Sequence, residues 1–341
     1  MSRVLGRSGI KVSDIGFGCW AIGGPFTADD KPAGWGEVDD DESAAALRRA
    51  FELGVTFFDT ADVYGAGHSE EVLRRALAGH RDEVVIATKF GNAFDAAQRA
   101  IIGQDASPGY IRRACLASLR RLGTDRIDLY QLHVGELPAG QAPEVTGALD
   151  TLLAEGLIRG YGWSTDDPER AAAFAGGAGC AAVQHEMNVL DDAPGVLAVC
   201  EKFDLASINR GPLAMGLLTG KYGAGSQVPP DDVRAAQPWM RYFAGGRPAP
   251  DWLARLDAVR EVLSEDGRTL AQGALCWLLA RSPRTVPIPG IRTVAQAEQN
   301  AAALSLGPLP AAQMAEIARL LGASAPGHLT WSGLQVSCSL P

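Results

Sequence analysis

Short apolar runs alternate with longer segments of helical pattern eight times along the 341-residue chain, and this alternation constrains the fold more than any other feature. The apolar runs are nearly continuous, as expected for parallel strands that are buried on both faces. Strands are predicted at residues 15–18, 56–58, 84–88, 127–132, 158–162, 181–185, 205–208 and 286–288. Helices are predicted at residues 41–53, 69–78, 109–122, 144–154, 168–174, 195–203, 271–281 and 294–304. Eight such pairs predict an α/β fold, either a closed (β/α)8 barrel or a large open sheet.

Two features favour the closed TIM barrel. No GxGxxG motif follows the first predicted strand, so the usual start of an open dinucleotide-binding sheet is missing. Polar residues that could react also follow several different strands, and barrels place their active sites at these strand ends. Residues 3–12, with Ser8-Gly9 at their centre, predict a hairpin that closes the bottom of the barrel.

Two stretches depart from the regular alternation. Residues 213–250 are rich in glycine and proline and predict a long loop after the seventh strand, and loops of this length are usually functional. Beyond residue 307 one short helix is expected at 311–321, followed by an irregular tail that contains Trp331 and Leu334. Because no linker separates two halves, residues 1–341 are interpreted as a single domain that includes 307–341.

Composition narrows the choice of partner and compartment. The net charge is −9 and no run of Lys or Arg appears, which argues against a nucleic-acid partner. No segment reaches the roughly 18 apolar residues of a membrane span, and the N-terminus lacks the apolar core of a signal peptide. The six cysteines form no CxxC pair and have the spacing of neither a zinc site nor a disulfide framework. A cytoplasmic protein without a metal is therefore expected, and its oligomeric state is left open.

Three polar residues follow the second, third and fourth predicted strands. Asp59 comes directly after Phe57-Phe58, Lys89 lies between a buried strand and Phe90, and His133 ends the run Leu129–Leu132. Each has an ordinary explanation: a helix cap for the aspartate, a surface lysine, a structural histidine. Tyr64 lies five residues beyond Asp59 on the same loop. Four separate ordinary explanations are less economical than one shared site at the rim of the barrel.

These four residue types have a chemistry in common. Tyrosine ordinarily has a pKa near 10, too high for easy proton donation at neutral pH, and a nearby Lys89 ammonium would lower it. Asp59 can hold Lys89 in place and balance its charge. His133 can donate a hydrogen bond to a carbonyl oxygen as negative charge develops there. The set therefore predicts an acid and an oxyanion stabiliser suited to hydride addition to a C=O group.

At this point the sequence resembles a known family. Matching segments in this order are GFGCWAIGG (16–24), FFDTADVYGAGHSE (57–70), ATKFG (87–91), DLYQLH (128–133), GWST (162–165), VQHEMN (183–188), GPLAMGLLTGKY (211–222) and PIPGIRTVAQAEQN (287–300). Together they resemble the bacterial aldo-keto reductases over about residues 3–305. The resemblance implies that Tyr64 is the general acid, that Lys89 and Asp59 tune it, and that His133 orients the carbonyl group.

The resemblance also implies a nicotinamide cofactor bound without a Rossmann motif. Its implied contacts are Gly18, Cys19, Trp20 and Asp59 near the ribose; Ser164, Thr165 and Gln184 at the carboxamide; Arg210 beside the ring; Pro212, Leu213, Gly216, Leu218, Gly220 and Lys221 over the pyrophosphate; and Gly290, Arg292, Gln296, Gln299 and Asn300 at the adenosine end. A helix beginning after Gly290 can present amide groups to an anion. Arg292 is a fork-shaped donor suited to a 2′-phosphate, so NADPH is favoured and NAD is possible as an alternative cofactor.

Three positions depart from the family's pattern. Thr165 stands where an asparagine is common, Arg210 where many members stack an aromatic ring on the nicotinamide, and Gln299 where a glutamate is common near the adenine. An arginine plane can stack on a ring or add positive charge beside it. The strictness of the preference for NADPH is therefore left open.

The substrate is less constrained than the chemistry. The predicted pocket contains Trp20, Trp35, Tyr64, Phe90, His133, Trp163, Trp239 and Tyr242. Aromatic walls suit a sugar face or a flat apolar carbonyl compound equally. Three functions therefore remain open: a carbonyl reductase of broad or sugar-type substrate range; a sugar or alcohol dehydrogenase or nucleotide-sugar reductase of the same family; and a cofactor-binding interaction subunit. The small-molecule enzyme is the interpretation that the complete set of four residues favours.

Overall fold

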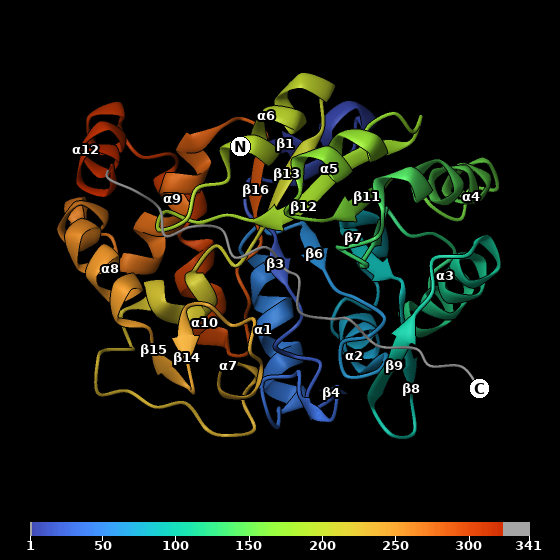
Figure 1. The fold of residues 1–341 in the computed structure, drawn as a ribbon, viewed down its shortest axis with the longest axis horizontal. Coiled ribbons are helices and arrows are strands. Elements are labelled where there is room, and N and C mark those ends of the chain that lie inside the picture. The colour runs from blue at the N-terminus through green and yellow to red at the C-terminus, as the bar shows by residue number, and fades with distance from the viewer. Residues whose placement is uncertain (1, 323–341) are drawn as a thin grey trace.

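A central sheet of eight parallel strands lies inside a ring of helices (Figure 1). The computed structural model describes residues 2–322. The strands of this sheet are β3 (Phe17–Gly18), β6 (Phe57–Asp59), β7 (Val85–Phe90), β10 (Leu129–Leu132), β11 (Tyr161–Ser164), β12 (Cys180–Glu186), β13 (Ala206–Arg210) and β16 (Thr285–Pro287). They pair in chain order, and the two outer strands meet through a parallel bridge between Gly18 and Gly290. The amide of Gly16 also donates to Pro287 O at 3.0 Å, so the sheet closes on itself as the predicted barrel.

The helices follow the strands, as the alternation predicted. They are α1 (Asp40–Glu52), α2 (His68–Ala76), α3 (Pro108–Leu122), α4 (Ala142–Ala154), α5 (Pro168–Phe174), α6 (Pro194–Phe203), α7 (Val233–Ala236), α8 (Pro250–Leu263), α9 (Leu270–Arg281), α10 (Val294–Ala301), α11 (Ala303–Leu306) and α12 (Ala311–Leu321). Local signals set their ends. In α3 the Ser107 side chain caps the first turn, and Gly123 ends the helix with φ of 63°, a left-handed conformation that favours glycine.

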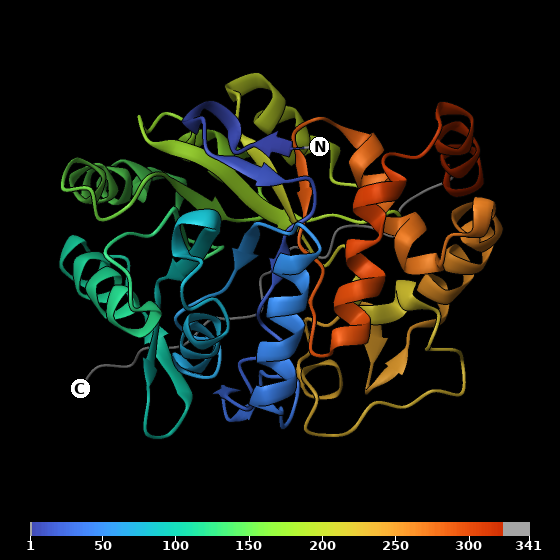
Figure 2. The same ribbon diagram turned by 180° about the vertical axis from the view of Figure 1, so that it is seen from behind.

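The predicted N-terminal hairpin is present and closes the bottom of the barrel (dark blue in Figure 2). Strands β1 (Ser2–Val4) and β2 (Lys11–Ser13) pair antiparallel around a short 3-10 turn. Leu5 and Ile10 are buried with the apolar side chains that fill the barrel interior. The amide of Arg7 donates to Asp204 O just before β13, which fixes the hairpin against the beginnings of the strands.

Some elements differ from the expectation. The hairpin of β8 (Asn92–Asp95) and β9 (Ala100–Gln104) was not predicted, because its residues are mostly half-buried or exposed and lack an apolar pattern. The fifth strand lies at Tyr161–Ser164, later than the predicted 158–162, because Ile158 makes only an isolated bridge to Ile127. Helix α8 lies directly beyond the predicted loop and is not among the eight helices predicted as partners of the strands, although the residues around Trp252 have a helical pattern.

The predicted long loop after the seventh strand is present and contains short elements of its own. A 3-10 segment (Ala214–Thr219), α7 and the two-residue strands β14 (Phe243–Ala244) and β15 (Arg247–Pro248) lie within it (Figure 1). It contacts a second short hairpin, β4 (Thr27–Ala28) with β5 (Lys31–Pro32), through Gln237 Nε2, which donates to Pro32 O at 3.0 Å. The two segments therefore meet at one rim of the barrel.

Residues beyond 322, among them Trp331 and Leu334, lie outside the described residues, and the single domain of residues 1–341 stays a prediction. Within the described part, the helix expected at 311–321 is α12. None of the helices described is both long and apolar enough to cross a membrane. Across residues 2–322 no cluster of His, Cys, Asp and Glu has the arrangement of a metal site.

Candidate active site

The topology brings the ends of consecutive strands to one rim. Strands β6, β7 and β10 are neighbours, with Asp59 paired to Ala87 and Lys89 paired to Gln131. Because the strands are parallel, their carboxyl ends lie at the same edge of the barrel, where barrel enzymes carry their active sites. Asp59, Lys89 and His133 therefore meet there, as the sequence predicted.

Lys89 is the centre of this cluster and has no exposed surface. Its Nζ donates to Asp59 Oδ1 at 2.5 Å, to the carbonyl oxygen of Thr60 at 2.8 Å and to the phenolic oxygen of Tyr64 at 3.4 Å. Burial alone would lower the pKa of Lys89, but the Asp59 carboxylate and Tyr64 outweigh it and hold that pKa above its ordinary value. The lysine is thus a cation held against the tyrosine.

Two glutamines fix the other oxygen of the aspartate. Asp59 Oδ2 accepts hydrogen bonds from Gln131 Nε2 at 2.9 Å and from Gln184 Nε2 at 2.8 Å. Gln131 was not singled out from the sequence. The available signal was its position two residues before His133, since alternate residues of a strand point to the same side. With Lys89, these contacts satisfy the carboxylate of a residue that is only 2% exposed as a whole.

Lys89 lowers the pKa of Tyr64, as predicted, but the net pKa of the buried phenol lies above its ordinary value. Burial raises the pKa of Tyr64, and the Lys89 charge offsets that effect only in part. The phenol therefore keeps its proton at neutral pH. The cation still favours the phenolate relative to an equally buried tyrosine without a lysine beside it.

His133 stands across the mouth from Tyr64. The two ring centroids are 5.8 Å apart and the rings are nearly perpendicular, at 86°. Burial lowers the pKa of His133 well below its ordinary value, and the positive charges of Lys89 and Arg210 add to the effect. Its Nδ1 is buried without a hydrogen-bond partner among the described residues. A neutral imidazole of this kind can donate one hydrogen bond to an incoming oxygen.

Stacked aromatic rings form one wall beside Tyr64. Trp20 stacks on Tyr64 with centroids 5.9 Å apart and on Trp239 of the long loop with centroids 6.2 Å apart. Trp35 meets Trp20 edge to face at 5.3 Å. The indole of Trp20 is fixed because its Nε1 donates to Ala33 O at 3.1 Å. The predicted pocket residues Trp20, Trp35, Tyr64, His133 and Trp239 are thus brought together.

Three predicted pocket residues are not brought to this wall. Phe90 is fully buried and packs on Tyr130. Trp163 is fully buried, packs on Phe174 of α5 and donates to Val134 O, on the helix side of its strand. Tyr242 is buried against Trp252 of α8. All three therefore belong to the apolar core instead of the predicted pocket.

The residues expected at a carboxamide have open hydrogen-bonding groups. Within residues 2–322, the hydroxyl of Ser164 and the Oε1 atom of Gln184 take part in no hydrogen bond. One hydroxyl donor and one amide acceptor match the acceptor and donor of a carboxamide. Thr165 is different, because its hydroxyl already donates to Gly135 O at 3.1 Å. The side chain of Cys19 is buried in the core.

Arg210 lies at the end of β13 within a charged network. Its guanidinium pairs with Asp166 and with Glu186, the latter at 3.2 Å. Arg241 of the long loop pairs with the other oxygen of Glu186 at 3.2 Å and also with Asp191. The network links the loop to the rim and balances the charge of an arginine that stands where an aromatic residue was expected.

The loop expected over a pyrophosphate has a strained backbone. Ala214, Met215 and Gly216 have φ of 47°, 53° and 95°. Two consecutive non-glycine residues in this left-handed region cost about 1–3 kcal/mol each and persist mainly at functional sites. Of the other predicted residues, Pro212, Leu213 and Leu218 are buried, while Gly220 and Lys221 are exposed.

The residues expected at the adenosine end surround the start of α10. Gly290 is exposed and adjoins Gly18, and Arg292 N donates to Gln296 Oε1 at 2.8 Å. The Arg292 guanidinium donates to the carbonyl oxygens of Trp35, at 3.0 Å, and Glu37. Further along the helix, Gln299 is half-buried and Asn300 is buried.

One neighbour of this region was missed by the sequence interpretation. The Glu42 carboxylate of α1 accepts from Val294 N at 3.0 Å, at the first residue of α10. A helix N-terminus favours negative charge, which explains this contact. The side chain therefore already occupies one of the amide groups that the sequence assigned to an anion.

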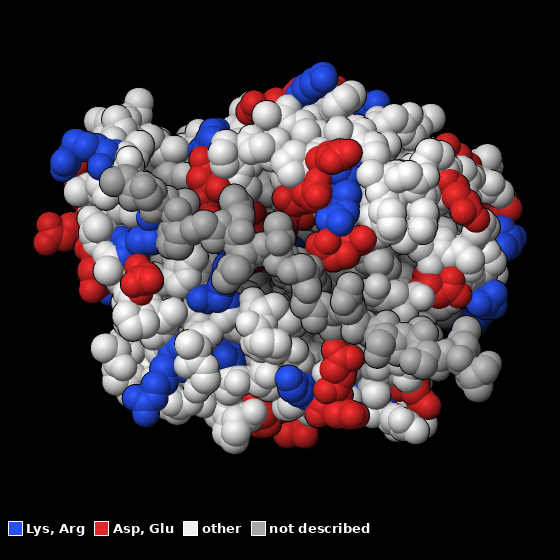
Figure 3. Space-filling view, viewed as in Figure 1, with Lys and Arg blue, Asp and Glu red and all other residues white. Residues whose placement is uncertain are grey.

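Charges elsewhere are mixed. On the face seen in Figure 3, acidic and basic side chains are interspersed.

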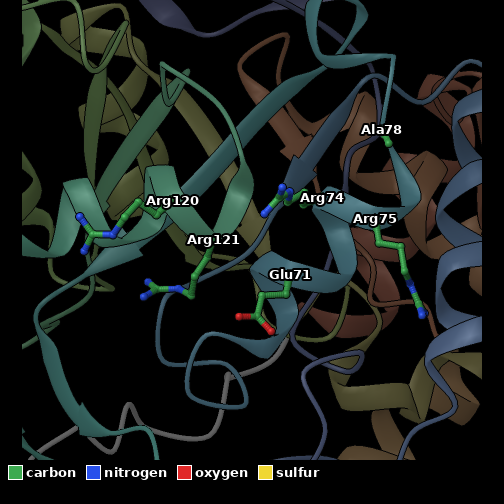
Figure 4. Close-up of a pocket in the computed structure, with 6 residues that line it drawn as sticks. All are labelled: Glu71, Arg74, Arg75, Ala78, Arg120 and Arg121. Carbon is green, nitrogen blue, oxygen red and sulfur yellow. The ribbon is translucent and has the colours of Figure 1, made fainter.

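A separate hollow of about 560 Å³ lies between α2 and α3 and is lined by Glu71, Arg74, Arg75, Ala78, Arg120 and Arg121 (Figure 4). Arg121 there is paired with the buried Glu70 at 2.6 Å, and Arg75 with Asp41 at 3.4 Å. None of these residues belongs to the rim cluster.

Comparison with known proteins agrees with the geometry. The model of the aldo/keto reductase family matches residues 14–321. The chain is 32% identical to the aldo-keto reductase yakc [NADP(+)] of Schizosaccharomyces pombe over 307 residues, which cover 86% of this chain and 84% of that protein.

Solved structures show the same fold. The glycerol dehydrogenase AKR11B4 from Gluconobacter oxydans superposes with a TM-score of 0.79 at 28% identity, covering 97% of this chain and 98% of that one. An aldo/keto reductase from Klebsiella pneumoniae, in complex with NADP and acetate, superposes with a TM-score of 0.70 at 28% identity, covering 96% and 97%.

Proposed function

This chain belongs to the aldo/keto reductase family, and from that premise we propose that it reduces an aldehyde or ketone to an alcohol with NADPH, with Tyr64 as the general acid. The observation that carries the proposal is the contact of one buried ammonium, Lys89 Nζ, with both Asp59 and Tyr64 at the rim of the barrel. The reaction class is oxidation and reduction between a CH–OH group and NADP.

Each of the rim residues has a separate role in the reduction of a carbonyl group. When bound, NADPH supplies a hydride to the carbonyl carbon. Tyr64 gives its proton to the carbonyl oxygen, so that a C–H and an O–H bond form and the phenol becomes a phenolate. Lys89 stabilises that phenolate, and Asp59 keeps the lysine in place. Neutral His133 donates a hydrogen bond to the same oxygen, an electrostatic effect that is strong in a site shielded from water.

The cofactor-binding role of the remaining rim residues is part of the proposal. Ser164 and Gln184 would hold the carboxamide through the two groups that are open in the structure. Gly18, Cys19 and Trp20 would adjoin the ribose, with Arg210 beside the nicotinamide ring. Residues 212–221 would cover the pyrophosphate, and Gly290, Arg292, Gln296, Gln299 and Asn300 would hold the adenosine end. Two similar proteins support NADP(H) as the cofactor, because the Schizosaccharomyces pombe reductase is named for NADP(+) and the Klebsiella pneumoniae structure is a complex with NADP.

The aromatic wall supports a substrate with at least one flat or apolar face. Trp20, Trp35 and Trp239 meet beside Tyr64. Such rings bind flat carbonyl compounds and the apolar faces of sugars. A sugar or alcohol dehydrogenase is the second candidate, because the glycerol dehydrogenase of Gluconobacter oxydans shares the fold over nearly the whole chain. A subunit that only binds cofactor is less well supported, since the four reactive residues are all present and in contact.

A panel of substrates tests this function. NADPH consumption is followed with aliphatic and aromatic aldehydes, ketones and aldoses, and NADP⁺ reduction with the matching alcohols and with glycerol. The proposal expects carbonyl reduction that is faster with NADPH than with NADH and is lost in Tyr64→Phe. Turnover of polyols alone would favour the dehydrogenase, and cofactor binding without any turnover would favour the interaction subunit.

A further inference from the structure

Arg292 holds the segment of chain that carries Trp35. Its Nη1 donates to the carbonyl oxygen of Trp35 at 3.0 Å and its Nη2 donates to that of Glu37. Both terminal nitrogens of the guanidinium therefore contact main chain two residues apart. A charged donor on two carbonyl groups of one short loop is a specific anchor, because the planar fork sets both directions.

The ring of Trp35 is part of the wall beside Tyr64. It contacts Trp20 at 5.3 Å edge to face, and Trp20 stacks on Tyr64 at 5.9 Å. On another side the guanidinium of Arg234 lies 4.7 Å from the Trp35 ring. A displacement of the Trp35 backbone would therefore change the surface that a carbonyl compound meets.

The hydrogen-bond donor of the Trp35 indole is not used among the described residues. Its Nε1 is buried and has no hydrogen-bond partner among the described residues. A buried donor without an acceptor is destabilising, so the ring is held by ring packing, by the Arg234 guanidinium and by the backbone anchor, and by no hydrogen bond of its own within residues 2–322. This is the property expected of a side chain that can take a second position.

We propose that Arg292 is a positioning residue for the substrate pocket, and that a 2′-phosphate bound to its guanidinium draws it away from Trp35 and Glu37 and so moves Trp35. This rests on the proposed function, because it takes NADPH as the cofactor. Between guanidinium and phosphate both donor and acceptor are charged, so these hydrogen bonds are stronger than those that the guanidinium donates to neutral carbonyl groups. The phosphate and the loop therefore compete for the same nitrogens.

The substrate pocket therefore has one shape when NADPH is bound and another when NADH is bound. With NADH, Arg292 keeps the loop and Trp35 stays against Trp20. With NADPH, the loop is released and the wall beside Tyr64 is rearranged. Coupling between two binding sites is reciprocal, so a substrate that prefers the rearranged wall raises the affinity for NADPH by the same factor.

Two nucleotides that lack nicotinamide test the coupling without turnover. Adenosine 2′,5′-bisphosphate and adenosine 5′-monophosphate differ by the 2′-phosphate alone, and their binding to the full chain is measured by calorimetry. At saturation, the bisphosphate is expected to change the tryptophan emission while the monophosphate leaves it nearly unchanged. The change should disappear in Trp35→Phe, which should still bind the bisphosphate.

Two arginine variants complete this test. Arg292→Ala should show an altered emission before any nucleotide is added and no further response to the bisphosphate. Arg74→Ala, which also removes one positive charge but lies at the hollow between α2 and α3 (Figure 4), should respond like the wild type.

The outcomes separate this inference from the proposed function. Bisphosphate binding without a Trp35-dependent change would overturn the positioning role and leave the cofactor assignment intact. Equal binding of the two nucleotides would overturn both the 2′-phosphate contact and the inference. In steady state, the KM for a carbonyl substrate should differ about 5-fold or more between NADPH and NADH in the wild type. The same KM should be nearly equal for the two cofactors in Arg292→Ala, and an unchanged difference would also overturn the inference.

Discussion

The ammonium nitrogen of Lys89 lies 3.4 Å from the phenolic oxygen of Tyr64. Burial raises the pKa of Tyr64 and the lysine only partly offsets it, so the proton stays on the phenol until an acceptor arrives. The lysine then matters after proton transfer, because the new phenolate forms beside a cation. This contact gives the tyrosine and the lysine separate, measurable roles.

Removal of the phenolic hydroxyl should abolish most of the turnover. Tyr64→Phe keeps the ring that stacks on Trp20 but cannot donate a proton. A general acid contributes about 10²–10⁴-fold to rate, so kcat should fall at least that much. Steady-state kinetics measure the fall in kcat, and calorimetric titration measures the binding of NADPH. Near wild-type kcat would refute the assigned acid, whereas weak cofactor binding would point to a damaged fold.

Loss of Lys89 should cost stability as well as activity. The Lys89 and Asp59 side chains are 0% and 3% exposed, so Lys89→Met leaves a buried carboxylate without its cation. Breaking a buried pair on one side typically costs about 3–5 kcal/mol in the free energy of unfolding. The double variant Asp59→Asn with Lys89→Met should lose less stability than Lys89→Met alone, because no buried charge is left without a partner. Urea unfolding gives both values, and equal losses would argue against a stabilising pair.

The barrel and its reactive rim could be predicted because both depend on short-range signals. Each buried strand is a short apolar run, and Asp59, Lys89 and His133 follow three of them directly. Parallel strands must end at one edge, so strand order alone brings these groups together. No knowledge of side-chain packing was needed for that step.

Side-chain direction and burial could not be predicted in the same way. A strand buried on both faces has no polar alternation, so nothing in the sequence distinguishes inward Lys89 from outward Phe90. Trp163 was assigned to the pocket for the same reason. The pKa of Tyr64 depends on its burial, which only the folded chain reveals. The hydrogen bond of Glu42 to α10 joins residues 252 positions apart and has no local signal.

Arg292 should distinguish the two cofactors. Its guanidinium is expected to contact the 2′-phosphate, a group that NADH lacks. Arg292→Ala should therefore weaken NADPH binding several-fold more than NADH binding, since hydrogen bonds to charged groups are worth about 1.5–3 kcal/mol. Calorimetric titration with both cofactors measures the difference. An equal loss for NADPH and NADH would count against the phosphate contact.

Arg210 should influence the balance between oxidised and reduced cofactor. Its charge faces the region of Tyr64 and His133 and is balanced by Asp166 and Glu186. Arg210→Met removes the cation, leaves Asp166 without its ion-pair partner and leaves Glu186 paired with Arg241 alone, which makes the site more negative. The positively charged nicotinamide of NADP⁺ should then bind more tightly relative to NADPH. Dissociation constants of both forms check this, with Arg74→Met as a control. An unchanged ratio would place Arg210 outside the reach of the ring.

Asp62 lies behind the rim and should make stability depend on pH. It is 1% exposed, and its Oδ1 has no hydrogen-bond partner among residues 2–322. The neighbouring Glu70 is also buried, but it is held by Arg121 at 2.6 Å and by Thr88 at 2.6 Å. Burial first, and then the Glu70 charge, raise the pKa of Asp62 well above its ordinary value. The folded protein therefore holds Asp62 protonated where the unfolded chain has already ionised it.

The sign of the pH effect follows from this difference. Above the unfolded pKa of about 3.9, and up to the raised folded pKa, unfolding releases a proton, so stability falls as the pH rises. One proton corresponds to about 1.4 kcal/mol per pH unit in the free energy of unfolding. Asp62→Asn removes this pH dependence. The stability of the variant relative to the wild type should therefore increase between pH 5 and pH 7. Urea unfolding at both pH values measures the gain, with the 88% exposed Asp125 changed to Asn as the control. A gain that is the same at pH 5 and pH 7 would show that Asp62 is ionised in the folded protein.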